Sequence, residues 1–451
     1  MDREAGRNIL LLTASALLTD LMGLGLRSWL AGRIGADGLG LVQLCLSVEG
    51  LAATLAISGL RFGTTRLVAE ELGLGRTGQV SAAVGRCLGY ASLFGLTAGL
   101  GLWLLADLTA ARWIGEAACA RALRFSAVSM PCIALSSALS GYFTAVGRLG
   151  KPALVHLIEQ LAGVGLVMAH LSAYRGVEPG LCCAAVSRGR AEADLLSLGL
   201  MLLAFWQDSR RYSPDPSAAP DLDERLLGIS LPLALAAYAR SGLSTARQLL
   251  TPRGLEAAGD SARQALAGYG SIQGMILPLL LFPAMIPGAA AELAVPVLTG
   301  AQVRGEKEAI RKTAGALTRR SLAYSLAVSA VLFFLSGPLA ERLFHRPELA
   351  RWIRLLVPLV PVMYLDTAVD GCLKGLGRQR ESMGINVLDG LLGLGLCVWL
   401  LPRYGLRAYV GGFYLTELSN LALSLGCLFT ALPASPAGAA RRSPARPEQT
   451  G

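Results

Sequence analysis

The chain has 451 residues, of which 53% are hydrophobic and 16% are charged, and its mean hydropathy is +0.52. Because an ordinary soluble domain carries about 25% charged residues, this composition excludes a soluble globular protein and indicates a membrane protein. The formal net charge of +10 fits basic loops beside anionic lipid, so it does not indicate a nucleic acid as a partner.

The charged residues fall in short clusters, and the apolar stretches between them are about 20 residues long, which is the length of a helix that crosses a bilayer. Helices are expected because hydrocarbon offers no water to satisfy backbone groups. The pattern predicts about twelve transmembrane helices and no cleavable signal sequence. In chain order they cover 8–30, 37–58, 83–106, 122–144, 153–173, 180–206, 227–250, 264–298, 317–337, 350–373, 383–402 and 405–431. The eighth is long enough to continue into an interfacial segment.

Lys and Arg residues favour one side of this predicted topology. About 23 of the 41 lie in loops on the side of the two termini, which is the bias that cytoplasmic loops show. The sequence therefore predicts a multi-pass protein of the plasma membrane with both termini in the cytoplasm.

The segment GYFTAVGRLGKP at 141–152 is matched 230 residues later by GCLKGLGRQRES at 371–382. Pairs that coincide at this offset include Pro131 and Pro361, Gly147 and Gly377, Arg148 and Arg378, and Glu159 and Asp389. A match of this length in one frame indicates an internal duplication. The arginine of each GR turn is expected to anchor to lipid headgroups.

Two six-helix halves follow from the duplication. Because six is an even number of spans, both halves enter the membrane from the same side and form parallel repeats. The predicted organisation is an N-terminal lobe at 1–206, a cytoplasmic linker at 207–226, a C-terminal lobe at 227–432 and a disordered cytoplasmic tail at 433–451.

Several segments along the chain carry a family resemblance. They are GLGLRSWLAGRIGADGLGLVQL at 23–44, LVAEELGLGR at 67–76, GYFTAVGRLGKPALVHLIEQ at 141–160, PLLLFPAMIPGAAAELAVP at 278–296 and YLDTAVDGCLKGLGRQRES at 364–382. In this order they resemble the stage V sporulation protein B family of oligosaccharide flippases, within the multidrug/oligosaccharidyl-lipid/polysaccharide exporter superfamily. The resemblance implies an all-α, V-shaped, two-lobed alternating-access transporter. Its expected cargo is a lipid-linked oligosaccharide or peptidoglycan precursor, moved outward for cell-wall, polysaccharide or spore-cortex synthesis.

The chain differs from the family's usual pattern at two places. Gly59-Leu60-Arg61 replaces a Gly-Ile-Pro-like turn, and Gly163 stands where an Arg often follows the Glu-Gln of the fifth span. The first difference makes Arg61 a substitute cation for the cargo headgroup.

A sugar pyrophosphate brings hydroxyls and about two negative charges, which cost several kcal/mol per group when left unsatisfied in hydrocarbon. Arg suits such a cargo because its fork matches two phosphate oxygens at once. The predicted substrate-binding residues are Arg27, Arg61, Arg240, Arg247, Glu49 and Glu159. Arg240 and Arg247 are seven residues apart and share a helix face. The alternatives are that an Arg snorkels to the interface and that each acid neutralises a nearby Arg.

Acidic residues of the second half form the predicted cation-coupling set. It consists of Asp366, Asp370, Asn386 and Asp389, which can hold Na⁺ or a proton. Here too, pairing of each acid with a nearby cation is the alternative. In the sixth span, the spacing of four residues predicts mutual compensation of Arg188 with Glu192 and of Arg190 with Asp194.

Enzymatic motifs find little support. GLGRTG at 73–78 does not follow a strand, no P-loop occurs, and His156, His170 and His345 are too far apart in sequence for a zinc motif. We therefore expect no enzyme activity, no cofactor other than a coupling Na⁺ or H⁺, and no certain metal site. The nine cysteines are expected to behave as small apolar residues.

Two alternatives to the flippase remain open. One is a cation-coupled multidrug antiporter of the toxin extrusion type, although the 6% aromatic content argues against cationic drugs. The other is a non-transporting membrane scaffold for cell-wall assembly. The expected partners are the lipid-linked sugar, membrane lipid and, for a role in wall assembly, cell-wall synthesis enzymes.

Overall fold

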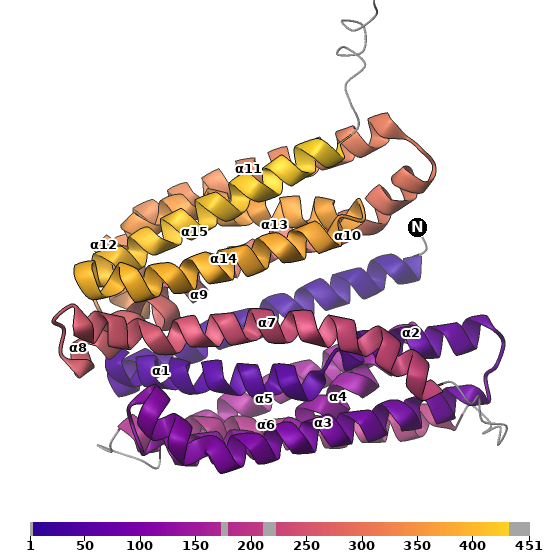
Figure 1. Cartoon of the computed structure of the whole chain (residues 1–451), viewed down its shortest axis with the longest axis horizontal. Helices are drawn as coiled ribbons and strands as arrows, with labels where there is room; N and C mark the ends of the chain where they lie inside the picture. The colour runs from indigo at the N-terminus through magenta and orange to yellow at the C-terminus, as the bar shows by residue number, and fades with distance from the viewer. Residues whose placement is uncertain (1–2, 173–178, 211–221, 433–451) are drawn as a thin grey trace, which may run out of the picture. The chain divides into compact units, whose positions relative to one another are not determined.

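The computed structural model describes residues 3–172, 179–210 and 222–432, with side chains described at Ser15 and from residue 17 onwards (Figure 1). Residues 211–221 of the predicted linker at 207–226 and the whole predicted tail at 433–451 lie outside these residues. Within the described ranges every regular element is a helix. The predicted all-α class is therefore confirmed for this part of the chain.

The α-helices follow the predicted order. They are α1 (Arg3–Ile57), α2 (Leu60–Gly73), α3 (Gln79–Thr109), α4 (Cys119–Ala145), α5 (Gly150–Ser172), α6 (Pro179–Ser209), α7 (Leu222–Ala257), α8 (Ala262–Tyr269), α9 (Leu277–Leu281), α10 (Met285–Val303), α11 (Lys307–Pro338), α12 (Leu349–Leu356), α13 (Val360–Gly375), α14 (Gln379–Trp399) and α15 (Leu401–Ala431). Three π-helical segments, Ala110–Ile114, Gly270–Ile276 and Leu339–Leu343, and two short 3₁₀ segments, Phe282–Ala284 and Val357–Leu359, lie between them.

Glycine residues mark several of the predicted span boundaries. The first two predicted spans form one long element, α1, which Gly35 interrupts with φ 76° and ψ 179°. Gly405 interrupts α15 in the same way, with φ 57°. The long eighth span at 264–298 is instead divided, because the 3₁₀ turn Phe282–Ala284 separates α9 from α10.

The described helices have the length and surface of membrane spans. Nine helical stretches, from Leu17–Gly73 to Gln379–Trp399, are long and apolar enough to cross a bilayer. The two elements α6 and α15 are not among them, and α6 carries the charged stretch 187–194. On α3, Leu93, Leu96, Leu100 and Leu104 are each 60–63% exposed along one stripe, a surface that suits lipid rather than water. The chain is thus a multi-pass membrane protein.

The helices form two compact units. The first comprises Met1–Phe282, Leu335–Leu355 and Gly390–Phe413, and in it α4 packs against α3 and α6 while α5 packs against α6 (Figure 1). The second comprises Pro283–Phe334, Leu356–Asp389 and Tyr414–Gly451, and in it α10 packs against α13 around Leu298 and Leu373. The division into lobes at 206/207 and 226/227 stays a prediction.

The internal duplication is confirmed by the backbone. Left-handed residues recur at the offset of 230: Gly75 and Gly305 have φ 73° and 71°, Gly147 and Gly377 have 74° and 71°, and Gly115 and His345 have 87° and 53°. The last pair follows a π-helical segment in each copy. The N–H of Arg148 donates to the Phe143 carbonyl at 2.9 Å, and that of Arg378 donates to Leu373 at 2.8 Å. Both GR turns therefore end their helix with the same hydrogen bond.

A close helix crossing recurs as well. A Cβ atom at Gly141 would lie 2.6 Å from the Arg61 carbonyl oxygen, and one at Gly371 would lie 2.6 Å from the Ala291 side chain. Arg61 and Ala291 are themselves 230 residues apart. Since only glycine allows this approach, Gly141 fixes the start of α2, and with it Arg61, against α4.

Candidate functional site

A cavity of about 470 Å³ lies among α1, α2, α4, α5 and α6, within the first compact unit. We call it the N-terminal cavity. The hydroxyl groups that line it belong to Ser15, Thr19, Ser136, Ser137, Ser140, Thr144 and Ser197. Its charged or titratable lining residues are Asp20, Arg61, His156, Glu159 and Asp194. None of the described lining residues is Phe, Tyr or Trp, so the wall is rich in hydroxyl groups and poor in aromatic rings.

Two of the predicted substrate-binding residues line this cavity, and two others, Arg27 and Glu49, border it. Arg61 enters it from the first turn of α2, which begins after the left-handed Gly59 (φ 72°). Glu159 enters it from α5. Arg27 lies close enough to interact electrostatically with Asp20 and Arg190, without lining the cavity itself. The sequence thus predicted part of one wall.

Glu159 joins two helices across the cavity. Its carboxylate accepts a hydrogen bond from the Ser197 hydroxyl on α6 at 2.6 Å. On its own helix, the Nδ1 atom of His156 lies 3.7 Å from the same carboxylate. The expected neutralisation by a nearby Arg is therefore replaced by a hydroxyl and a histidine as its direct partners.

Arg190 has a different hydrogen-bonded partner from the one predicted. Its guanidinium donates to Glu49 on α1 at 3.2 Å, and the Ser126 hydroxyl on α4 donates to the other oxygen of Glu49 at 2.8 Å. Asp194 interacts electrostatically with Arg190 and through its side chain with Ser129 on α4. Arg190 therefore interacts electrostatically with Asp194, as predicted, but its hydrogen-bonded partner is Glu49, because the Glu49 side chain is 7% exposed and a buried carboxylate without a cation is costly.

The companion pair of α6 is confirmed. Arg188 donates to Glu192 at 2.9 Å, four residues further along the helix. The Nε2 atom of His170 on α5 lies 2.8 Å from the same carboxylate. Here the spacing of four residues predicts the partner correctly, because it places the two side chains on the same face of α6.

Acids and arginines are nearly balanced at the N-terminal cavity. The groups that line or border it are Arg27, Arg61, Arg190, His156, Asp20, Glu49, Glu159 and Asp194. Opposite unit charges 4 Å apart attract by about 4 kcal/mol at an effective dielectric constant of 20, so an arriving anion must compete with these carboxylates. Protonation of an acid, or a bound cation, would free guanidinium groups for that anion.

The predicted cation-coupling residues all lie in the second unit. The structure places a further residue, Asn420, beside Asp366, whereas the Asn386 amide forms its hydrogen bond elsewhere. Asp366 accepts a hydrogen bond from the Asn420 amide at 2.9 Å, and it also interacts with Ser424 and electrostatically with Asp370 and Asp389. The Oδ1 atoms of Asp366 and Asn420 are buried and have no hydrogen-bond partner among the described residues. These two oxygens are of the type that Na⁺ or a proton requires.

Asn386 and Asp370 lie in other surroundings. The Asn386 amide donates to the Ser382 carbonyl on its own helix at 2.9 Å. Asp370 accepts a hydrogen bond from the Ser382 hydroxyl and pairs with Lys374 at 2.6 Å. Asn420 therefore supplies the amide next to Asp366. Its signal in the sequence is the polar TELSN stretch at 416–420 inside an apolar helix.

Arg240 and Arg247 do not line the N-terminal cavity. Arg240 is exposed on α7, and Arg247 is partly buried and interacts electrostatically with Tyr269 and Tyr409. Their predicted role in binding cargo stays a prediction.

The first GR turn carries an unforeseen ion cluster. Asp208 is fully buried just beyond the predicted span 180–206, and it binds Arg148, the Lys151 ammonium at 3.0 Å and the Tyr142 hydroxyl at 2.8 Å. Burial alone would raise the pKa of Asp208, but hydrogen bonds from Lys151, Tyr142 and Arg148 outweigh it and hold this pKa below its usual value. Arg148 thus neutralises a buried acid, whereas Arg378 of the second copy pairs with exposed Glu381 at 2.7 Å.

The MatE family model matches residues 14–169 and 258–399. Stage V sporulation protein B of Bacillus subtilis (strain 168) is 21% identical over 427 residues, which cover 92% of this chain and 82% of that protein. Sporulation protein YkvU of the same organism is 23% identical over 270 residues, which cover 59% of this chain and only 60% of that protein's length.

Solved structures share the fold. A multidrug resistance MATE family transporter of the MOP superfamily, in an inward-facing conformation, matches with a TM-score of 0.71 and 15% identity, over 92% of this chain and 93% of its own. The MATE multidrug transporter DinF-BH, in complex with R6G, gives 0.70 and 13%, over 95% and 96%. A MOP superfamily transporter from Pyrococcus furiosus, whose binding pocket has reversed polarity, gives 0.65 and 15%, over 94% of both chains.

Proposed function

The chain belongs to the MatE family of membrane transporters, and we propose that it flips a lipid-linked oligosaccharide or peptidoglycan precursor from the cytoplasmic to the outer leaflet by alternating access. The proposal rests on the N-terminal cavity, whose wall combines seven hydroxyl groups with Arg61 and no aromatic ring among its described lining residues. Resemblance to stage V sporulation protein B supports the same cargo class.

The wall chemistry suits a sugar phosphate. Each sugar hydroxyl that leaves water needs a hydrogen-bond partner, and serine and threonine hydroxyls both donate and accept. Arg61 offers the two-pronged fork that matches phosphate oxygens, and Arg27 lies next to the cavity near Asp20. A planar organic cation would instead favour aromatic faces.

The nearby carboxylates give a means of coupling. In the proposed cycle, Na⁺ or H⁺ binds the acids of the cavity, the arginines are released from them, and the phosphate enters. When the cation leaves, the carboxylates again compete for the guanidinium groups and weaken the hold on cargo. Asp366, with the unpartnered oxygens beside it, is the proposed second cation site.

The cellular setting is part of the proposal. The excess of Lys and Arg in one set of loops supports a plasma-membrane protein with both termini in the cytoplasm. In that orientation the precursor would be loaded where it is synthesised and released to cell-wall synthesis enzymes outside.

A multidrug antiporter is the second candidate. Two observations favour it: the fold is shared with multidrug transporters, and three carboxylates of the cavity wall face one arginine and one histidine. An acidic wall attracts cations, and the missing aromatic rings are the observation against it.

Proteoliposomes separate the two candidates. We expect the purified chain to expose a fluorescently labelled lipid-linked sugar to an enzyme or quencher on the far side of the membrane, and not to transport a cationic dye. Arg61→Ala should lose this activity, and Arg61→Lys should recover part of it. Arg66→Ala is the matched control, since Arg66 lies on the same helix, is 67% exposed and pairs with Glu70. Dye transport without lipid flipping would favour the antiporter.

A further inference from the structure

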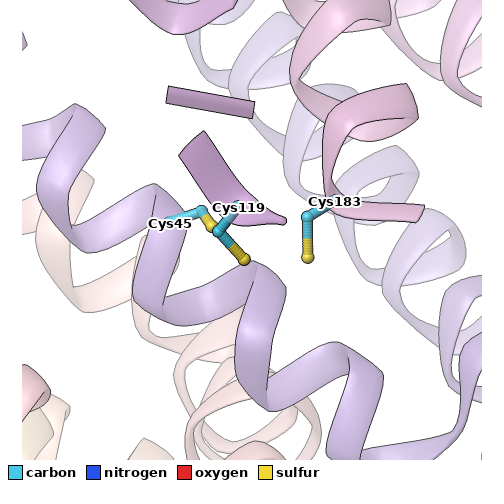
Figure 2. Close-up of side chains that lie close together, drawn as sticks. All are labelled: Cys45, Cys119 and Cys183. Atoms are coloured by element: carbon cyan, nitrogen blue, oxygen red, sulfur yellow. The ribbon is translucent and has the colours of Figure 1, made fainter. Parts of the chain in front are cut away.

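Three cysteines from three helices meet in the interior of the first unit (Figure 2). They are Cys45 of α1, Cys119 of α4 and Cys183 of α6, and their sulfur atoms all lie within 4.8 Å of one another. Their exposures are 2%, 0% and 1%, and all three are free thiols. Cysteines so far apart in sequence were expected to be ordinary apolar side chains, so their convergence is a property of the fold alone.

The spacing of the sulfur atoms fits a metal ion. With a metal–sulfur bond of about 2.3 Å, three sulfur atoms in a trigonal arrangement lie about 4.0 Å from one another. The observed limit of 4.8 Å requires only a small inward movement of the side chains. Thiol sulfur is a soft ligand, which selects soft metals such as Cu(I).

The number of ligands distinguishes between thiophilic metals. The group has three members among the described His, Cys, Asp and Glu residues. Structural zinc sites are almost always four-coordinate, and a three-sulfur site therefore suits Cu(I) better than Zn²⁺. Each thiol that binds as a thiolate gives up its proton.

Two helix ends compensate the negative charge that such binding creates. Cys119 is the first residue of α4, and Cys183 lies in the second turn of α6, which starts at Pro179. Helix N-termini carry a partial positive charge and favour thiolates. Of the two acids that interact with Cys45 and Cys119, Glu49 and Glu116, the first is already paired with Arg190.

We propose that Cys45, Cys119 and Cys183 bind one Cu(I) ion through their three sulfur atoms and so tie α1, α4 and α6 together. The same three helices hold the Glu49–Ser126–Arg190 contact. Glu49 lies four residues after Cys45, and Ser126 and Arg190 lie seven residues after Cys119 and Cys183. These separations place both groups on the same helix faces, one or two turns apart. The metal would therefore set the spacing of the helices around the N-terminal cavity.

A titration of the purified full chain tests the site. The reduced protein, in detergent and without oxygen, competes for Cu(I) with a coloured Cu(I) chelator such as bicinchoninate. We expect it to remove one equivalent of Cu(I), and X-ray absorption at the copper edge to show sulfur as the only ligand atom. Cys45→Ser, Cys119→Ser and Cys183→Ser should each weaken binding at least tenfold.

The matched control is Cys182→Ser. Cys182 is also buried and is adjacent to Cys183 in the same turn of α6, but it is not a member of the group. We expect Cu(I) to raise the unfolding temperature of the unaltered chain. The Cys182→Ser variant should bind Cu(I) equally well and show the same rise in unfolding temperature.

Other outcomes would overturn the proposal. They are Cu(I) uptake no greater than that of the variant with all three cysteines replaced, a disulfide between two of the three in the isolated protein, and oxygen or nitrogen ligands at the copper. The absorption spectrum and the stoichiometry of the unaltered chain decide the question even if a serine variant fails to fold.

Discussion

Replacing Arg190 with Ala tests whether its contact with Glu49 stabilises the fold around the N-terminal cavity. The Glu49 side chain is 7% exposed and accepts one hydrogen bond from Arg190 and one from Ser126. Without the guanidinium, its carboxylate must stay buried with a single hydroxyl as donor or take up a proton. Glu49→Gln removes the same charge but leaves a neutral group of similar shape facing Ser126. The two variants therefore differ in what they leave buried.

The expected magnitude follows from that difference. Removing one partner of a buried ion pair costs about 3–5 kcal/mol. Because the Arg190 side chain is 46% exposed, we expect the lower end of this range, about 3 kcal/mol, which is about a 100-fold loss in the ratio of folded to unfolded protein. Glu49→Gln should cost about 1 kcal/mol. Adding it to Arg190→Ala should restore about 2 kcal/mol, since no buried charge then remains.

Thermal unfolding in detergent, followed with a thiol-reactive fluorophore, measures the relative stabilities of Arg190→Ala, Glu49→Gln and the double variant. Eight of the nine cysteines are buried, so the dye reports the opening of the helices. Arg188→Ala is the control on α6: its partner Glu192 keeps a contact with His170, and we expect a change below about 1 kcal/mol. If Glu49→Gln destabilises as much as Arg190→Ala, or the double variant recovers nothing, the buried-charge argument is wrong.

Three further predictions concern other parts of the chain. The folded state holds the pKa of Asp208 below its value in the unfolded chain, which is about 3.9. Asp208 therefore stabilises the fold above about pH 3.9, and this stabilisation is lost as the pH falls through the pKa of the folded state. Asp208→Asn should flatten this dependence of stability on acid pH when unfolding is followed by tryptophan fluorescence. Gly141→Leu should cost about 1–3 kcal/mol by overpacking and should also reduce flipping, because it displaces the backbone of Arg61; flipping at the normal rate would contradict this. Asp366→Asn should remove the response of flipping to Na⁺ or membrane potential, whereas Asp370→Asn, whose charge is locally compensated, should retain it; a response kept by both variants would assign both acids a structural role, and one lost by both would place Asp370 in the coupling site as well.

The sequence predicted most of the helices because the membrane restricts the choice so strongly. Apolar length fixes a span, and a backbone that cannot reach water must form a helix. The positions of Gly35 and Gly405 mark breaks that the sequence already showed as charged or turn-like boundaries. The offset of 230 likewise predicted the paired turns at Gly147 and Gly377.

The contacts of the candidate site were harder to predict. Spacing along a helix gives the neighbours of Arg190 on α6, but its real partner, Glu49, lies 141 positions away in the chain. That partner depends on how far each helix is rotated about its axis, which packing against neighbouring helices decides. The same holds for Asn420 beside Asp366 and for the sulfur atoms of Figure 2. Hydrophobicity alone does not determine these rotations.

The repeated turns also bear on how the two halves of this chain diverged. At the turn after the π-helical segment, Gly115 of the first half corresponds to His345 of the second. The left-handed φ of 53° is strained for a histidine and not for a glycine. The two halves thus share the backbone conformation at this turn, although only the first half has a glycine there. The chemistry has not been inherited in the same way: Arg61 corresponds to Ala291 and Cys119 to Leu349. The duplicated helical unit therefore provides two regions whose side chains can change independently. A polar network in one half does not require a matching network in the other half.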